Sequence, residues 1–205
     1  MTKRRSQTRT RKRSAKPSRK RSARPSRKHS ARPARKRSPK ARPRAPKPAA
    51  VLGLTALAED DLELSEKVPN KAEKTVVGAA STIIRRGTPE FDALVSNQNA
   101  DVVFKDEENT GADRMMTSRL AARVDALASL VRSEWTGVRL RVTEAWDENL
   151  EHGPRSIHYE ARAVDLTTSP IDGSKLGRLA RLAVNAGFDW VFYENKQHVH
   201  ASMSK

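Results

Sequence analysis

The stretch Ser156-Ile-His-Tyr-Glu-Ala-Arg-Ala-Val-Asp165, followed later by His198-Val-His200, decides how the fold and the site of this 205-residue chain are interpreted. Neutral imidazole and carboxylate are the ligands that a catalytic zinc ion takes, with three from the protein and the fourth position left to water. The spacing predicts that His158, Asp165 and one of His198 and His200 hold a metal ion. Spacing alone does not choose between the last two.

Strands are expected over four stretches, at residues 101–104, 138–144, 161–167 and 189–193, because β-branched and apolar residues alternate or cluster there. Side chains two apart share a face of a strand, so Ala161, Ala163 and Asp165 are expected to align. The same rule places His198 and His200 on one face of a last short strand.

Helices are expected over residues 88–95, 113–135 and 174–187. Thr88 suits the N-cap of the first helix, and Gly187 suits a left-handed end for the third. An acidic linker is expected over residues 59–74, and residues 76–84 suit a strand or an irregular arm. The interspersed elements predict an α+β class, with a mainly antiparallel sheet packed with two longer helices.

The stretch Lys105-Asp-Glu-Glu-Asn-Thr-Gly-Ala-Asp-Arg114 carries four carboxylates around a glycine. Calcium takes six to eight oxygen ligands from loops of this kind. The alternative is a solvated acidic loop that opens the next helix, with Asp113 favouring the helix dipole. A second acidic cluster, Glu144 to Asn149, follows the strand at 138–144, and the two clusters could share a cation.

The charge of the chain is divided between a tail and a body. Residues 1–48 contain 22 Lys and Arg and no Asp or Glu, so the formal charge of +17 splits into +22 and −5. An eight-residue repeat starts at Arg11, Arg19 and Arg27, without large apolar residues, and predicts a disordered tail. Its charge suits nucleic acid or another polyanion, through salt-sensitive phosphate contacts. The alternative is a solubilising extension with no dedicated partner.

Residues 49–65 are expected to be a linker that carries a weak targeting segment. A short apolar run ends at Ala56-Leu57-Ala58, which resembles a cleavage site, and the Arg- and Ser-rich start resembles a transit peptide. No apolar run approaches the roughly 20 residues that span a bilayer. Export (secreted or periplasmic) and a cytoplasmic location both stay open. The absence of cysteine excludes disulfides, thiolate metal sites and a cysteine nucleophile.

Several longer stretches carry a resemblance to a known family. They are Lys105–Arg114, Leu140–Glu148, His158–Asp165, Leu179–Val184, Ala186–Val191 and Tyr193–Glu194 before His198–His200, with Asn70–Lys74 at the start. Together they closely resemble the Hedgehog N-terminal signalling domain, over roughly residues 66–203. That domain is in turn similar to bacterial zinc D-alanyl-D-alanine carboxypeptidases. The resemblance implies a metal-binding domain over residues 66–205.

The resemblance also implies roles for particular residues. The zinc ligands would be His158, Asp165 and His200, with Glu194 as the general base. His152 and His198 match the supporting histidines. A calcium-type site would use Glu107, Glu108, Asp113, Glu144, Asp147 and Asn149. Asn149 stands where the family has a carboxylate, which removes one charge from that site.

The chain departs from the family pattern at three places. The lipid-bearing cysteine is absent, and the chain ends two residues past Met203 without an autoprocessing domain. These departures argue against a lipidated morphogen. Ala161 replaces a glycine that is usual in the motif, a change expected to be tolerated.

Three functions are compatible with these features. The preferred hypothesis is a zinc peptidase, of the carboxypeptidase kind, acting on peptidoglycan-type peptides, because the set of histidines and carboxylates is complete. The alternative is a non-catalytic zinc- and calcium-binding module for cell–cell signalling, with a receptor or glycan as partner. A second alternative is a protein that binds nucleic acid or another polyanion through its tail.

Overall fold

The protein is described by a computed structural model over residues 60–205. The predictions made for the basic tail at 1–48 and for the apolar run before residue 59 lie outside the described residues. Nothing in the structure therefore bears on the polyanion-binding tail or on the targeting segment.

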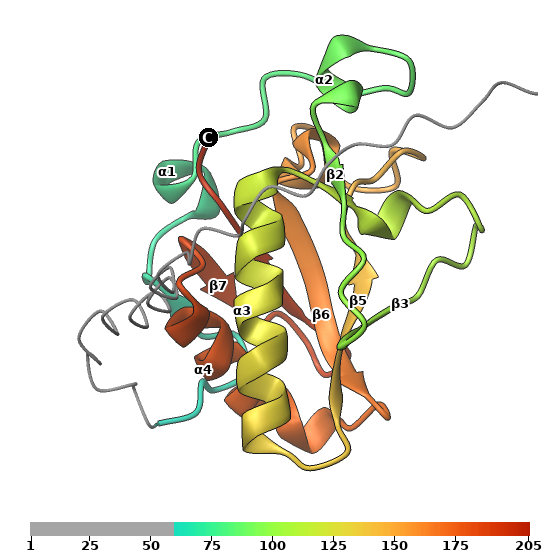
Figure 1. Ribbon diagram of the computed structural model, residues 1–205. Helices are drawn as coiled ribbons and strands as arrows, with labels where there is room; N and C mark the ends of the chain where they lie inside the picture. Colours follow the sequence, from blue (N-terminus) through green and yellow to red (C-terminus); the bar gives the residue numbers. More distant parts are fainter. Residues whose placement is uncertain (1–59) are drawn as a thin grey trace, which may run out of the picture. The chain divides into compact units, whose positions relative to one another are not determined.

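A six-stranded sheet organises the described domain (Figure 1), in the order β1-β7-β8-β6-β5-β3. The strands are β1 (Lys67–Val68), β7 (Trp190–Phe192), β8 (Val199–Ser202), β6 (Ala163–Ser169), β5 (Arg139–Glu144) and β3 (Val102–Phe104). Every neighbouring pair is antiparallel except β3 with β5. A separate ribbon joins β2 (Val95–Ser96) to β4 (Met115–Met116). The predicted α+β class with a mainly antiparallel sheet is confirmed.

Two longer helices, α3 (Ser118–Glu134) and α4 (Leu176–Ala186), lie side by side against one face of the sheet (Figure 1). The shorter helices are α1 (Glu73–Val76) and α2 (Pro89–Asp92), with 3-10 turns η1 (Ala112–Arg114), η2 (Ile157–Glu160) and η3 (Gly173–Lys175). Thr88 caps α2 by accepting a hydrogen bond from Phe91 N, and Gly187 ends α4 at φ +86°. Both helix-end predictions are confirmed.

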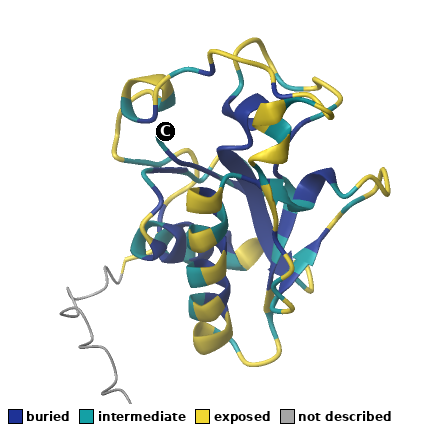
Figure 2. Cartoon of the chain, turned by 45° about the horizontal axis from the view of Figure 1, so that its top comes forward, coloured by how far each residue is buried: buried dark blue, intermediate teal, exposed yellow. Residues whose placement is uncertain are grey.

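The main core fills the space between the sheet and these two helices, as the buried colouring of the sheet indicates (Figure 2). Leu140 and Val142 of β5 point into it, together with Val164 and Leu166 of β6, and all four side chains are fully buried. Because neighbouring side chains on a strand point to opposite faces, Asp165 lies on the face away from the helices. That alternation places the carboxylate where the site is built.

The long helix begins five residues later than the periodicity predicts. Asp113 is buried in η1, and Met115 and Met116 form β4 by pairing with β2. Thr117 caps α3 by accepting a hydrogen bond from Leu120 N. The interpretation of Asp113 as a residue of the helix start is therefore wrong, because strand pairing takes priority over helix periodicity.

Ala161 is not part of β6, which begins at Ala163. It ends η2 in the left-handed region, at φ 52° and ψ 36°, and is fully buried. Left-handed backbone disfavours residues with a Cβ by about 1–2 kcal/mol. The expected alignment of Ala161 with Ala163 and Asp165 is therefore wrong, although the last two do share a face. A glycine at position 161 would avoid this conformational cost.

The N-terminal arm, residues 69–84, is docked onto the domain rather than free. Arg162 donates hydrogen bonds to Val77 O (3.0 Å) and Gly78 O (3.3 Å). Glu160 accepts hydrogen bonds from the backbone N–H groups of Ser81 (2.8 Å) and Thr82 (3.1 Å). Residues 76–84 hold no strand, so the irregular arm is the correct alternative.

The expected acidic linker at 59–74 is wrong for its described part. Leu62 is only 3% exposed, and its N–H donates to Gly177 O. β1 then adds to the sheet edge beside β7, and α1 follows. Burial of Leu62 and the pairing of β1 hold residues 60–74 against the domain, although their composition is that of a loop.

Candidate metal centre

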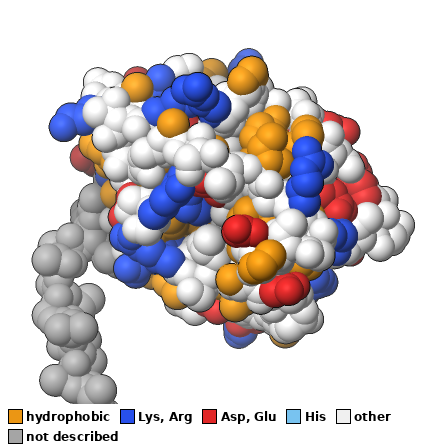
Figure 3. Space-filling view, turned by 90° about the horizontal axis from the view of Figure 1, so that it is seen from above, with side chains coloured by type: hydrophobic (Ala, Val, Ile, Leu, Met, Phe, Trp, Pro, Cys, Tyr) orange, Lys and Arg blue, Asp and Glu red, His pale blue; other side chains and the backbone are white. Residues whose placement is uncertain are grey.

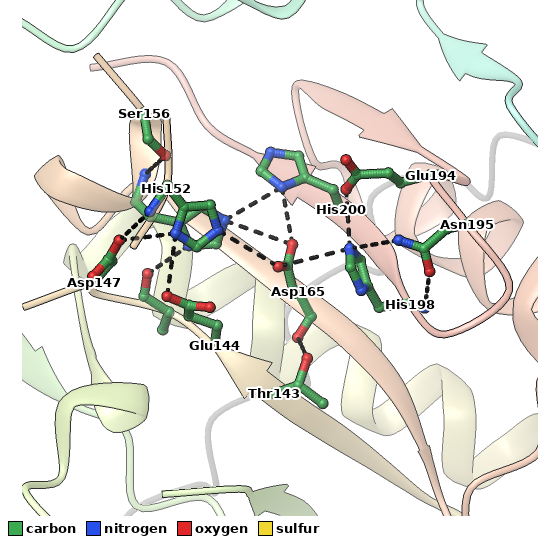
Figure 4. A network of polar contacts seen from close by, with 12 residues as sticks. Thr143, Glu144, Asp147, His152, Ser156, Asp165, Glu194, Asn195, His198 and His200 are labelled. Carbon is green, nitrogen blue, oxygen red and sulfur yellow. Dashed lines mark hydrogen bonds and ion pairs between the residues drawn. The ribbon is translucent and has the colours of Figure 1, made fainter. Parts of the chain in front are cut away.

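The sheet face opposite the helices carries a cluster of histidines and carboxylates. Asp165 of β6 and His200 of β8 are direct cross-strand partners. His158 comes from η2, whose N-cap Ser156 accepts a hydrogen bond from His158 N at 3.3 Å. Figure 4 shows Asp165 at the centre, with His152 on one side and His198 and His200 on the other.

Three ligand atoms converge at distances that suit one metal ion. His158 Nε2 lies 3.6 Å from Asp165 Oδ1 and 3.3 Å from His200 Nδ1, and Asp165 Oδ1 lies 2.9 Å from His200 Nδ1. A tetrahedral zinc ion with ligands at about 2.0–2.1 Å separates neighbouring ligand atoms by about 3.3 Å. The donor set and its spacing therefore fit zinc.

Both histidines are held through their second ring nitrogen. His158 Nδ1 lies 2.7 Å from Ala145 O, which can only accept, so this nitrogen donates and Nε2 faces the cluster. His200 Nε2 lies 2.8 Å from Glu73 Oε1, while Nδ1 faces Asp165. Hydrogen bonds of this kind fix the tautomer and the orientation of metal-binding histidines.

The charges of the cluster stabilise one another. Burial by itself would raise the pKa of Asp165, but the surrounding His158, His152 and His200 hold it well below its usual range. Burial would lower the pKa of His200, but hydrogen bonds to Asp165 and Glu73 raise it to about 10. The buried Asp165 carboxylate is therefore held in its charged form, which is the form that binds a cation.

His152 joins this cluster to the neighbouring acidic one. Its ring stacks on His158, with centroids 4.2 Å apart, and its Nδ1 lies 2.9 Å from Asp147 Oδ2. The pKa of His152 is raised to about 11, first by the Asp165 carboxylate and then by Glu144. The position of His152 suits a supporting residue rather than one of the three ligands.

Glu194 and His198 form a pair at the outer side of the cluster. His198 Nε2 lies 3.0 Å from Glu194 Oε2 and 3.8 Å from Asp165 Oδ2. This hydrogen bond with His198 is the largest influence on the pKa of Glu194, which is lowered. Between the two alternatives for a third ligand, His200 has the closer approach to Asp165, and His198 is engaged with Glu194.

A groove with a cavity volume of about 410 Å³ opens onto the cluster. Trp190 and Phe192 of β7 supply apolar walls, and Glu73 and Lys74 of α1 close one side. The groove therefore offers a bound group both an apolar contact surface and the potential metal position.

The acidic residues expected to bind calcium lie together around a second, smaller cavity of about 110 Å³. The lining includes Glu107, Glu108, Asp113, Glu144, Asp147 and Asn149. Burial, followed by the nearby Glu144 and Glu108, raises the pKa of Asp113 to about 6, although Asp106 N donates to it. Several carboxylates gathered around one small cavity suit a hard cation with oxygen ligands, although Lys105 pairs with Glu107 and His152 with Asp147.

Glu73 was missed by the sequence interpretation. The stretch that contains it was assigned to an acidic linker and used to mark the start of the domain, and 127 residues separate Glu73 from His200. No local pattern could link a glutamate in a four-residue helix to a histidine in the last strand. Contact of this kind follows from the pairing of β1 with β7, which brings the two chain ends of the domain together.

Figure 3 shows basic side chains scattered over one face, with acidic side chains gathered at one edge. Among residues 60–205, no helix has the length and apolar character needed to cross a membrane.

Together, the fold and the site define an α+β domain with two clusters of candidate metal ligands. The model of the Hedgehog amino-terminal signalling domain matches residues 56–202. The chain therefore belongs to the Hedgehog amino-terminal signalling-domain family.

Curated relatives agree with this assignment. Sonic hedgehog protein of Danio rerio is 53% identical over 145 residues, covering 69% of this chain and 34% of the relative. Indian hedgehog protein of Gallus gallus is 55% identical over 138 residues, covering 66% and 34%. Protein hedgehog of Drosophila melanogaster is 50% identical over 144 residues, covering 69% and 31%. The chain thus spans about a third of the length of these relatives, and the family favours the signalling alternative over the preferred peptidase.

Proposed function

We propose that the domain is a metal-carrying binding module of a signalling protein, and that it works without cleaving its partner. The observation that carries the proposal is the open groove whose floor holds His158, Asp165 and His200 within 3.6 Å of one another. A groove with aromatic walls and a few convergent polar groups is the usual form of a binding site.

Zinc at His158, Asp165 and His200 would act as a structural and recognition element. Three protein ligands leave one coordination position for a donor group from a partner. Calcium in the acidic cavity would neutralise the carboxylates and order the loop that carries Glu107 and Glu108. Both metals would then shape one continuous surface, because His152 contacts Asp147 on one side and His158 on the other.

The partner would be a receptor or a cell-surface glycan, which places the working protein outside the cell. This part of the proposal extends from the family's description as a signalling domain. Binding of the labelled full chain to receptor-bearing cells tests it, with and without EDTA. Metal-dependent binding that is lost in Asp165→Asn and kept in Glu194→Gln is the expected result. Binding that is indifferent to both metals and to Asp165 would contradict it.

A zinc peptidase is the second candidate, and one observation favours it. Ligand atoms of Asp165, Glu194 and His200 all lie within 4.8 Å of one another, so Glu194 could reach a water molecule at the metal position. Against it, the hydrogen bond with His198 lowers the pKa of Glu194, which makes this carboxylate a weaker general base. Release of D-alanine from a muropeptide by the zinc-loaded chain, abolished in Glu194→Gln, would establish the peptidase.

Polyanion binding by the basic tail is independent of both candidates. It is motivated by the 22 basic residues without an acidic residue at positions 1–48. Nucleic-acid affinity that falls steeply with salt, and that vanishes on deletion of residues 1–48, is the expected result. Equal affinity with and without the tail would remove this function.

A further inference from the structure

Glu73 is a carboxylate that directly contacts a member of the proposed zinc site but comes from the N-terminal arm. We propose that Glu73 is a positioning residue for His200, and that it couples metal binding to the docking of the N-terminal arm. This inference rests on the proposed zinc site and adds the arm to it.

The geometry is that of a supported ligand. Glu73 Oε1 lies 2.8 Å from His200 Nε2, on the side of the ring opposite to Asp165. The His200 side chain is 13% exposed and the Glu73 side chain 21% exposed, so solvent weakens this contact only in part. A histidine that binds metal through one nitrogen commonly gives its other N–H to a carboxylate, which holds the ring in place. His200 binding through Nδ1 requires that Nε2 keep its proton, and Glu73 is placed to accept it.

The helix that carries Glu73 depends on such a contact. α1 has four residues, none of them buried, and its N-cap has no side-chain hydrogen bond. A helix of this length is not stable by itself. Two hydrogen bonds hold the arm on either side of α1, and in both a backbone carbonyl of the arm is the acceptor. Trp190 Nε1 donates to Lys71 O at 2.9 Å, and Arg162 Nη1 donates to Val77 O at 3.0 Å. Glu73 lies between these two hydrogen bonds in the sequence and connects α1 to His200 of the proposed zinc site.

Coupling between the arm and the metal must work in both directions. If docking of Glu73 raises the affinity for zinc by some factor, bound zinc raises the equilibrium constant for docking of the arm by the same factor. Loss of a residue that supports a metal ligand typically weakens metal affinity about 10- to 100-fold. Since Glu73 and Lys74 line the groove, the metal would thereby define the wall that a partner meets.

The test compares the full wild-type chain with Glu73→Gln and with Glu90→Gln as a matched control. Glu90 is an exposed carboxylate on α2 whose substitution leaves the centre untouched. Zinc affinity is measured by competition with a chromophoric chelator, and amide exchange of residues 69–84 is measured by mass spectrometry with zinc and with EDTA. Co²⁺ spectra of the three proteins report the ligand geometry.

We expect Glu73→Gln to weaken zinc binding about 10- to 100-fold and to change the Co²⁺ spectrum, whereas Glu90→Gln changes neither. Zinc should slow exchange around residues 71–77 in the wild type and have little effect there in Glu73→Gln. Unchanged zinc affinity in Glu73→Gln would overturn the inference and leave the zinc site standing. Faster exchange throughout the sheet in that variant would also overturn it, because Glu73 would then support the fold. A wild-type chain that takes up no zinc would remove the zinc site and the inference with it.

Discussion

Asp165 and His200 face each other across the antiparallel strands β6 and β8, with Asp165 Oδ1 2.9 Å from His200 Nδ1. This pairing gives His198 and His200 different roles. His200 points its Nδ1 into the proposed zinc site, while His198 is hydrogen-bonded to Glu194.

The first prediction follows from this separation. His200→Ala should abolish stoichiometric zinc binding, because it removes one of three protein ligands. His198→Gln should keep one zinc per chain, with affinity reduced by no more than about 10- to 100-fold, as for a supporting residue. Metal analysis after dialysis checks both variants. Loss of zinc in His198→Gln with retention in His200→Ala would reverse the ligand assignment.

The second prediction concerns the left-handed residue Ala161. Ala161→Gly relieves about 1–2 kcal/mol of backbone cost but loses a buried methyl group worth about 0.8 kcal/mol and adds chain entropy in the unfolded state. These terms nearly cancel, so the free energy of unfolding should change by less than about 1 kcal/mol. Ala161→Val should destabilise by more than about 2 kcal/mol, because a β-branched residue fits neither the backbone nor the buried site. Chemical denaturation of the two variants measures the difference.

The third prediction concerns the buried pair of Glu160 and Arg162, whose closest atoms are 2.6 Å apart with both side chains 4% exposed. Glu160→Gln removes the negative charge that pairs with a buried guanidinium and should destabilise the domain by about 3–5 kcal/mol. Limited proteolysis should then cut the N-terminal arm near Ser81 and Thr82 before other sites, since both residues donate to Glu160. Arm cleavage at the wild-type rate would contradict the role of Glu160 as its anchor.

The fourth prediction is a dependence of stability on pH. Burial alone would raise the pKa of Asp189, but hydrogen bonds from Ser204 and the charge of Arg119 lower it. A carboxyl group whose folded pKa is depressed adds stability above its unfolded pKa of about 3.8, and loses it as pH falls through the folded pKa. Asp189→Asn should therefore be less stable than the wild type at pH 5–7. The gap should shrink below about pH 3.8, which thermal unfolding at several pH values would show.

The fifth prediction concerns the acidic cavity. Asn149→Asp adds a carboxylate to the lining of Glu107, Glu108 and Asp113, which increases the ligand charge that attracts calcium. Calcium affinity should rise by about tenfold, while zinc affinity stays unchanged. Calorimetric titration with each metal measures both quantities. Gln98→Glu adds the same charge at an exposed residue that is not in the cavity lining and is the matched control, expected to leave calcium affinity unchanged.

Most of the sheet and its attached ligands could be predicted from local pattern. Alternation over residues 138–144 corresponds to β5, and the fold does place His158, Asp165 and His200 together. Spacing grouped His158 and Asp165 with the last two histidines, and only the family resemblance singled out His200. Strand periodicity fixes the face on which each side chain lies, so a ligand such as Asp165 can be assigned a face before its partner strand is known.

The remaining features depended on contacts that no local pattern encodes. Met116 fits the helical period but pairs with β2, and Ala161 fits the strand period but adopts a left-handed turn. Glu73 reaches the site only because the domain brings its first and last segments together. Periodicity therefore predicts which segments form helices and strands. Tertiary contacts determine where these elements begin and end, and which residues support the metal ligands.

The sheet order has a consequence for how the domain is synthesised. Among the strands of residues 60–205, β1 lies at an edge of the sheet and pairs with β7 alone, which is formed by Trp190–Phe192. A growing chain therefore exposes its first strand and Glu73 long before their partners leave the ribosome. Because the sheet is completed only by its last two strands, the metal position can form only near the end of translation of this domain. Metal loading must accordingly follow synthesis rather than guide its early steps.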